Sequence, residues 1–331
     1  MTVTAKMIAE QLGLSPAAVS LALNNRPGVS AKTRAVVIET ARSLGFDFSK
    51  LKFERIRSSS IELICYSKHQ IFGTSFFSEM VSGIEEELRI RDYRFTIRQV
   101  STYESVRAQI ASIADAASGG VILLATEMNE IDLMPFAALD IPLVLLDTCI
   151  SAGLDRVQIN NREGSRIAVE YLSSRYGSFP GYLRSSARIS NFEERLDGYL
   201  LALRLAGGSA ESCIVHELGA TVETARNDML AIIDSGTELS SCYLSDFDDI
   251  AIGAIQAFAA RGYRIPQDIG FIGFDNSQGA TNAHPSLSTI NVPAGYMGAI
   301  AARRLVEILN ESEHHPIRIE IGVSLIRRES A

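Results

Sequence analysis

The feature that most constrains this chain is a repeated alternation of short apolar segments with amphipathic segments from residue 61 onward. The predicted strands are 61–66, 93–99, 120–125, 142–147, 179–184, 212–216, 241–244 and 269–274. The predicted helices are 76–91, 103–117, 161–175, 191–206, 222–235 and 249–262. Such alternation predicts an α/β fold with helices on both faces of parallel sheets, and there are enough units for two sheets. Ligands then bind beyond the carboxyl ends of the strands, in a cleft between two lobes.

Residues 1–46 show a different pattern, with three short helical segments and tight turns. Thr4, Ser15 and Ser30 are each suited to cap the start of a helix, and Gly13 and Gly45 to end one. Two helices joined by a glycine-containing turn and followed by a third predict an all-α helix-turn-helix domain. Its second helix, 15–24, would enter the major groove of DNA.

The predicted DNA contacts fall into two groups. The exposed residues of the second helix face the bases, and they are Pro16, Ala17, Ser20 and Leu21. Residues near helix starts offer hydroxyls, amides and charge to phosphates, and they are Thr4, Ser15, Ser20, Asn24, Ser30, Lys32, Thr33 and Arg34. Apolar side chains make no bidentate hydrogen bonds to bases, so readout is expected to depend on few contacts and on DNA shape. The alternative is a three-helix cap that packs on the body.

The charge of the chain is unevenly distributed. The 331 residues carry a formal net charge of −8, but residues 1–57 hold nine basic and four acidic side chains, a net +5. The remainder therefore carries −13. A basic head on an acidic body indicates that only the head contacts an anionic polymer.

Several classes of function find no support in the sequence. Its four cysteines are scattered, without the spacing of a metal site or a disulfide framework. No apolar signal segment and no run of about 18 apolar residues is present, which predicts a cytoplasmic protein without a membrane span. Phosphate loops, nucleotide fingerprints and nucleophile elbows are also missing, so we expect no catalytic residues, no metal and no cofactor.

Residues 7–46 resemble the DNA-binding head of the lactose-repressor (LacI/GalR) family. The residues that carry the resemblance are Ile8-Ala9, Gly13-Leu14-Ser15, Val19-Ser20, Leu23-Asn24, Val29-Ser30, Thr33-Arg34 and Leu44-Gly45-Phe46. The resemblance continues to Arg327-Arg328 and so covers nearly the whole chain. It implies a homodimeric transcriptional regulator, usually a repressor, that binds a pseudo-palindromic operator in double-stranded DNA and senses a small polar effector, most often a sugar. Its sensor would be two-lobed and periplasmic-binding-protein-like.

These features together predict three parts. Residues 1–46 form the helix-turn-helix domain, 47–60 a linker, and 61–331 the effector-binding and dimerisation domain. Its first lobe spans about 61–158 and 290–316, and its second about 159–289 and 317–331. The linker departs from the family, because Lys52 and Arg55 stand near where the alanine and leucine of an Ala-Arg-x-Leu hinge helix are expected.

Seven residues are predicted to bind the effector. Asp147 is chosen because it ends a buried apolar strand. The resemblance implies the aromatic Phe76, the Asn160 that replaces a usual aspartate, Arg195 in an Arg-x-x-Gly-Tyr stretch, Phe247, and Asp275 in a Gly-Phe-Asp-Asn stretch. Gln278 lies near Asp275 in the sequence. Asn161 could simply cap a helix, and Arg195 could form a surface ion pair with Glu193 or Glu194.

Two other functions remain open at this point. A solute-binding protein without a regulatory role would share the two lobes but would need an export signal in place of the basic head. A DNA-binding dimer that senses no small molecule is the second alternative, because Phe247 and the linker depart from the family pattern.

Overall fold

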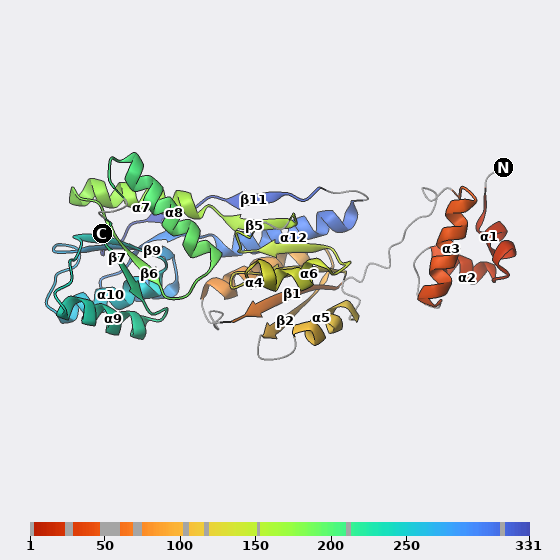
Figure 1. Ribbon diagram of the computed structural model, residues 1–331, viewed down its shortest axis with the longest axis horizontal. Helices are drawn as coiled ribbons and strands as arrows, with labels where there is room; N and C mark the ends of the chain where they lie inside the picture. The colour runs from red at the N-terminus through yellow and green to blue at the C-terminus, as the bar shows by residue number, and fades with distance from the viewer. Residues whose placement is uncertain are drawn as a thin grey trace. The chain divides into compact units, whose positions relative to one another are not determined.

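A computed structural model describes residues 3–23, 29–46, 60–68, 75–101, 106–115, 119–150, 153–209, 213–311 and 315–331. The chain forms two compact units, Met1–Ser58 and Ser59–Ala331 (Figure 1). Of the predicted linker, residues 47–59 lie outside the described part of the chain, and with them lie the residues of the atypical hinge.

The first unit contains three helices, α1 (Ala5–Leu12), α2 (Pro16–Leu23) and α3 (Ala31–Ser43). The three predicted caps are confirmed. The side-chain oxygens of Thr4, Ser15 and Ser30 accept hydrogen bonds from the backbone N–H groups of Met7, Ala18 and Thr33 at 3.4, 3.1 and 3.0 Å. Gly13 follows α1 in the left-handed conformation, with φ of 63°. The helices enclose a small core of Ile8, Ala9, Val19, Ala22, Leu23, Val37 and Ala41.

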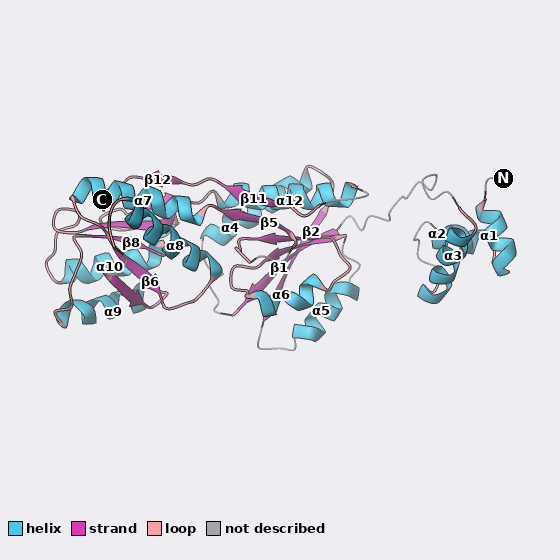
Figure 2. Cartoon of the chain, turned by 45° about the horizontal axis from the view of Figure 1, so that its top comes forward, coloured by secondary structure: helices cyan, strands magenta, loops and turns pink. Residues whose placement is uncertain are grey.

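The second unit contains two six-stranded sheets (Figure 2). The first has the strand order β11-β5-β4-β3-β1-β2 and the second β12-β10-β9-β8-β6-β7. All pairings are parallel except that between β10 and β12. The two sheets confirm the predicted α/β class, with one sheet in each lobe.

The first lobe is built from β1 (Ser60–Ser67), α4 (Ser75–Arg89), β2 (Arg94–Ser101), α5 (Val106–Asp115), β3 (Gly120–Leu124), α6 (Glu130–Ala137), β4 (Leu143–Leu146), β5 (Asp155–Ile159), α12 (Ala294–Asn310) and β11 (Arg318–Ile321). The second is built from α7 (Asn161–Tyr176), β6 (Gly181–Ser185), α8 (Ser190–Leu205), β7 (Val215–Leu218), α9 (Val222–Asp234), β8 (Cys242–Ser245), α10 (Asp248–Ala260), β9 (Gly270–Asp275), α11 (Gln278–Asn282), β10 (Ser288–Asn291) and β12 (Ser324–Ile326).

The structure corrects the predicted lobe boundary near the carboxyl terminus. Residues 317–331 were assigned to the second lobe as a block, but β11 pairs in parallel with β5 of the first sheet. Only β12, which pairs with β10, joins the second sheet. Helix α6 and strand β5 were not predicted, and β7 begins a few residues later than expected.

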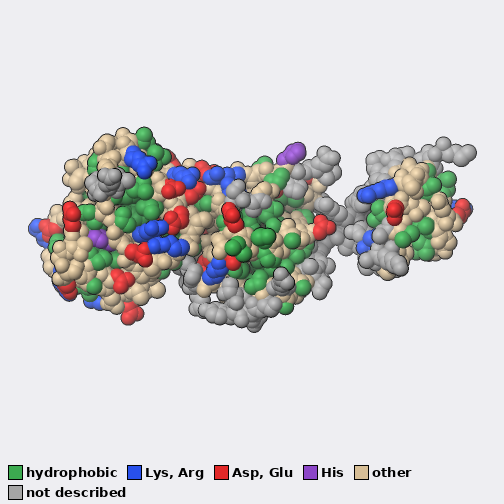
Figure 3. Space-filling model, in the orientation of Figure 1, with side chains coloured by type: hydrophobic (Ala, Val, Ile, Leu, Met, Phe, Trp, Pro, Cys, Tyr) green, Lys and Arg blue, Asp and Glu red, His purple; other side chains and the backbone are tan. Residues whose placement is uncertain are grey.

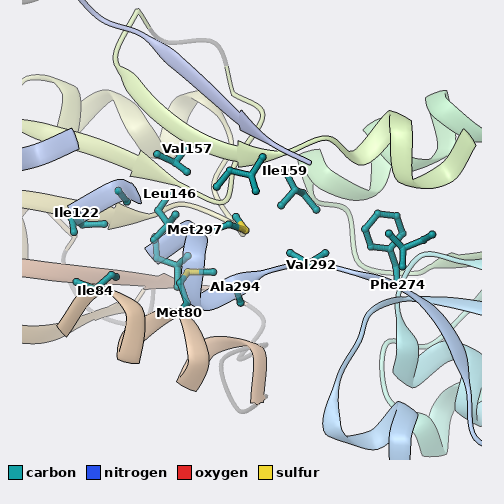
Figure 4. Close-up of a cluster of buried hydrophobic side chains, with 14 of the residues drawn as sticks. Met80, Ile84, Ile122, Leu146, Val157, Ile159, Phe274, Val292, Ala294 and Met297 are labelled. Carbon is teal, nitrogen blue, oxygen red and sulfur yellow. The ribbon is translucent and has the colours of Figure 1, made fainter. Parts of the chain in front are cut away.

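The chain therefore passes between the lobes three times, after β5, after β10 and after β11. An apolar cluster runs along these crossings (Figure 4). Ile159 and Val292, on two of the crossings, lie between the first-lobe core around Met80 and Leu146 and the second-lobe Phe274. Apolar packing therefore holds these two crossings against the cores of both lobes.

Helices α4 and α12 pack against each other on the first sheet at a glycine contact. A Cβ atom added at Gly83 would lie 1.9 Å from the carbonyl oxygen of Gly295, and one added at Gly298 would lie 2.2 Å from that of Met80. Only a residue without a Cβ permits so close an approach of two backbones.

Among the helices of the described residues, none combines the length and the hydrophobicity that a membrane span requires.

Candidate functional site

A cavity opens where the carboxyl ends of strands from both sheets face each other. First-lobe residues on its wall are Phe76, Phe77, Met80, Leu124, Thr126, Glu127 and Asp147. Second-lobe residues on its wall are Ile189, Asn191, Phe192, Arg195, Phe247, Asp248, Asp249, Asp275 and Ser277. Such a position, beyond the strand ends of two parallel sheets, is where open α/β folds bind ligands.

Five of the seven residues predicted to bind an effector line this cavity: Phe76, Asp147, Arg195, Phe247 and Asp275. They come from segments up to two hundred residues apart in the chain, and the two lobes bring them together. The other two predicted residues lie elsewhere. Asn160 caps α7 by accepting a hydrogen bond from Glu163 N–H at 2.9 Å, and the exposed Gln278 donates one to Asn282 at 3.2 Å.

Arg195 is the centre of the second-lobe wall, and its side chain is only 5% exposed. Its Nε donates to Asn161 Oδ1 at 2.9 Å, one Nη to the carbonyl of Asp246 at 2.5 Å, and the other to Asp275 Oδ1 at 3.1 Å. The guanidinium also lies 3.8 Å from the centre of the Phe274 ring. The alternative of a surface ion pair with Glu193 or Glu194 is therefore wrong.

A hydrogen-bond chain joins the two lobes at the cavity. Asp147 is buried and accepts hydrogen bonds from first-lobe Thr126 at 2.7 Å and from second-lobe Asn191 at 3.0 Å. Asn161, at the crossing, donates to Asn191 at 3.3 Å and accepts from Arg195. Asn161 therefore does more than start a helix: it connects Arg195 to the residue that contacts the first lobe.

Two of the cavity carboxylates lie on unusual backbone. Asp147 and Asp275 have φ of 57° and 102°, and the following Asn276 has φ of 60°. Residues other than glycine rarely adopt positive φ, and such strain is concentrated at functional sites. Each of these aspartates stands at the end of a strand of a different sheet. The positive φ at both positions is therefore backbone evidence, independent of the side chains, that the cleft is a functional site.

Burial raises the pKa values of these acids toward neutral pH. It raises the pKa of Asp147 to about 6, although the bond from Thr126 and the Arg195 charge oppose the rise. Burial, and to a smaller extent the Asp275 charge, raises the pKa of Asp248 to about 7. The same cause raises the pKa of Asp246 to about 7 and also that of Asp275. Perturbed groups gathered at one cleft are typical of a functional site.

The aromatic wall contains a residue that the sequence analysis did not name. Phe192 on α8 stacks on Phe247 with ring centroids 5.4 Å apart and an interplanar angle of 3°. Phe192 has the helical spacing of a core residue, so only its position three residues before Arg195 could have indicated a place in the cavity. Asp248 and Asp249 were also not predicted as site residues, although they begin the helix that follows the strand at 241–244.

The polar side chains of the cavity form no metal site among the described residues. Among the residues that the structure describes, no group of three His, Cys, Asp or Glu side chains is placed to hold a metal ion. Outside the cavity, basic and acidic side chains alternate where the lobes meet (Figure 3). Ion pairs there include Arg162 with Glu194 at 3.5 Å and Arg318 with Glu320 at 2.5 Å.

In the first unit, the predicted DNA contacts lie mostly on the surface. Thr4, Ser15, Pro16, Ala17, Ser20 and Ser30 are exposed, and Leu21, Thr33 and Arg34 are half-buried. Asn24 and the side chain of Lys32 lie outside the described part of the chain. Because Val19, Ala22 and Leu23 hold α2 to the core, the opposite face of α2 is presented to solvent.

Comparisons with known proteins agree with this architecture. A family model for the periplasmic binding protein-like domain matches residues 178–331. The "Probable HTH-type transcriptional repressor ExuR" of Bacillus subtilis (strain 168) is 26% identical over 336 residues, covering 99% of this chain and 98% of the relative. The HTH-type transcriptional repressor PurR of Pasteurella multocida (strain Pm70) is 25% identical over 334 residues, covering 99% and 98%. Both relatives carry the names of HTH-type transcriptional repressors.

Solved structures share the fold over the full chain. The transcriptional regulator CelR in complex with cellobiose matches with a TM-score of 0.75 and 23% identity, covering 99% of this chain and all of that one. The lac repressor dimer bound to operator matches with a TM-score of 0.73 and 20% identity, covering 100% and 99%. At these identities the solved structures establish the fold alone. Over nearly its full length the chain is therefore similar in sequence to HTH-type transcriptional repressors and shares the fold of the lac repressor.

Proposed function

We propose that this chain is a homodimeric, sequence-specific repressor in the cytoplasm, whose affinity for operator DNA is controlled by a small polar effector bound between its lobes. The observation that carries the proposal is the cavity whose wall joins Asp147 of the first lobe to Arg195 and Asp275 of the second. Guanidinium and carboxylate groups suit the hydroxyls of a sugar. The cellobiose complex of the similar regulator CelR supports the same class of effector.

The cavity offers a physical route from effector to DNA. An effector that contacts both walls stabilises one relative arrangement of the lobes over others, and its influence is limited to the difference in its affinity for them. The Asp147–Asn191 hydrogen bond spans the lobes and would be remade or exchanged when the effector enters. A coupling of about 1–3 kcal/mol is typical of such regulation.

A homodimer follows from the kind of DNA site proposed. Two copies of the helix-turn-helix domain contact two half-sites, so the two-fold symmetry of the protein imposes a pseudo-palindromic operator. The solved lac repressor is a dimer on its operator, which supports the same assembly here. The acid-rich cavity is proposed to bind its effector without chemical conversion.

The experiment that tests this function begins with selection of an operator from random double-stranded DNA by the full chain. Affinity for the selected DNA is then measured by fluorescence anisotropy at two salt concentrations, with and without sugars. We expect an inverted-repeat sequence, an affinity that falls steeply with salt, and a change of about fivefold or more with one sugar.

A matched pair of variants locates the DNA-binding face. Ala17→Glu places a negative charge on the exposed face of α2 and should abolish binding to the operator, whereas Ala259→Glu, at an exposed position of α10, should not change it. Failure to select any DNA would favour a solute-binding protein. Selection of an operator with no response to any ligand would favour a DNA-binding dimer that senses no small molecule.

A further inference from the structure

The charge on the cavity wall is strongly unbalanced. Five carboxylate side chains line it, namely Glu127, Asp147, Asp248, Asp249 and Asp275. Among the described residues of the wall, Arg195 is the only cation. A cavity with this balance repels anions and attracts cations, because field lines are concentrated in a cleft with low-dielectric walls.

The single cation is already engaged by the protein. Arg195 donates to Asn161, to the carbonyl of Asp246 and to Asp275, so its charge is matched by Asp275 before any ligand enters. An anionic ligand that contacted Arg195 would therefore also lie close to the Asp275 carboxylate. A like charge beside a half-buried carboxylate is unfavourable.

Two of the other aspartates are satisfied by protein donors. Asp147 accepts from Thr126 and Asn191, and Asp248 accepts from Thr289 and from the backbone N–H of Ser277, both at 2.6 Å. These bonds hold both side chains in place on the wall. Both carboxyl groups nevertheless line the same cavity.

Asp249 differs from them. It stands in the first turn of α10, is half-buried and lines the cavity. Within the described residues, no hydrogen bond or ion pair to its carboxylate is present. Burial and the nearby charge of Asp275 raise its pKa. With no protein donor on it among the described residues, this carboxylate is available to a donor supplied by the ligand.

The remaining wall is aromatic. Phe76 and Phe77 belong to the first lobe, and the stacked pair of Phe192 and Phe247 to the second. Aromatic faces bind the apolar face of a sugar ring and also attract ammonium groups. The wall therefore combines surfaces for a ring, acceptors for hydroxyls, and an unpaired carboxylate for a cation.

We propose that the effector is a hydroxylated amine of the hexosamine class, with its ammonium on Asp249 and its ring against the phenylalanines. This assignment rests on the proposed function of the cavity as an effector site. It disfavours uronates, sugar phosphates and nucleotides, because each would bring an anion to the carboxylate wall. An ammonium is favoured over a metal ion, since no three-ligand group is placed for a metal among the described residues.

The assignment is tested by isothermal titration of the full chain with three matched series of sugars. Each series holds a hexosamine, its parent hexose, its N-acetyl derivative and the corresponding uronate, in the gluco, galacto and manno configurations. We expect one hexosamine to bind at least about tenfold more tightly than its parent hexose and its uncharged N-acetyl derivative, with the uronate weakest. A hexose or uronate that binds as tightly as every amine overturns the assignment, as does the absence of binding by all three hexosamines.

A variant separates the charge of Asp249 from the rest of the wall. Asp249→Asn should weaken binding of the amine by about tenfold or more and that of the parent hexose by less than about threefold. Asp140→Asn, at an exposed position outside the cavity, is the matched control and should change neither. Equal losses for amine and hexose in Asp249→Asn would show that the carboxylate does not recognise a cation.

The outcomes also separate this inference from the proposed function. A neutral sugar that binds and changes operator affinity would support regulation by an effector and overturn the hexosamine assignment. A hexosamine that binds through Asp249 without changing operator affinity would support the assignment and contradict the regulatory role.

Discussion

The two lobes have similar sheets but contribute different chemistry to the cavity between them. The first lobe supplies an apolar surface around Met80 and Leu124 and two carboxylates, Glu127 and Asp147. The second lobe supplies Arg195 and three of the aspartates, together with the stacked phenylalanine pair. The difference teaches that the second lobe carries four of the six charged side chains of the cavity, including its only cation among the described residues. Substitutions that remove charge should therefore act most strongly in the second lobe.

Arg195→Met is expected to have the largest effect. It leaves the Asp275 carboxylate without its ion pair at 3.1 Å, and breaking a buried pair typically costs about 3–5 kcal/mol. The free energy of unfolding, measured with urea, should fall by an amount in this range. Arg261→Met is the matched control, because its pair with Asp234 is exposed to solvent and should contribute little to stability. A loss in Arg195→Met no greater than in the control would contradict the comparison.

Gly83→Ala tests the rigid apolar lobe. The added Cβ would meet the backbone of Gly295 and force α4 and α12 apart, which should lower the free energy of unfolding by about 1–3 kcal/mol or more. Gly322→Ala has open space around the new Cβ and should be nearly neutral. Urea unfolding of both variants provides the measurement, and an unchanged Gly83→Ala would show that the helix contact is adaptable.

Asp147→Asn tests the one buried carboxylate that the first lobe contributes to the hydrogen-bond chain. Burial raises its pKa from 3.8 to about 6, so the folded state binds more protons than the unfolded state between these values. Protonated Asp147 therefore makes its full contribution to the free energy of unfolding below about pH 4, and this contribution is lost as the pH rises through about 6. The asparagine variant should lose less stability than the wild type between pH 4 and pH 7.

The expected difference in that comparison is on the order of 1–3 kcal/mol. Urea unfolding at several pH values measures it, with Asp140→Asn as control. Part of the pH dependence should persist in Asp147→Asn, because burial also raises the pKa values of Asp246 and Asp248 to about 7. Identical pH profiles for variant and wild type would mean that Asp147 does not titrate in this range.

Phe76→Ala is expected to have the smallest effect, because it removes surface and no charge. The affinity for whichever sugar binds should fall by about fivefold, equivalent to about 1 kcal/mol. Phe247→Ala should cost more, since it also removes the stacking on Phe192. Phe179→Ala, on a partly exposed ring outside the cavity, serves as control in the same titration. A larger loss of affinity for Phe76→Ala than for Phe247→Ala would show that the first-lobe ring contributes more to binding than the second-lobe ring.

Much of the site was predictable because its residues stand at strand ends or in short motifs. Asp147 and Asp275 each close an apolar strand, and that position alone places them at the ligand-binding edge of a sheet. Arg195 was found through its motif. Phe192 and Asn161 were not predicted as site residues, because an aromatic residue on a helix and an asparagine at a helix start have common structural roles.

The sequence by itself determined the α/β alternation, the helix caps of the first unit and the strand-end carboxylates, because these follow from local periodicity and from hydrogen bonds between near neighbours. Only the tertiary structure decided that β11 joins the first sheet, that Asn161 connects Arg195 to Asn191, and that Asp249 stands without a donor among the described residues. Strand pairing and the matching of charges across a cleft depend on residues far apart in the chain. No local pattern encodes which distant partner a short strand or a buried side chain will meet.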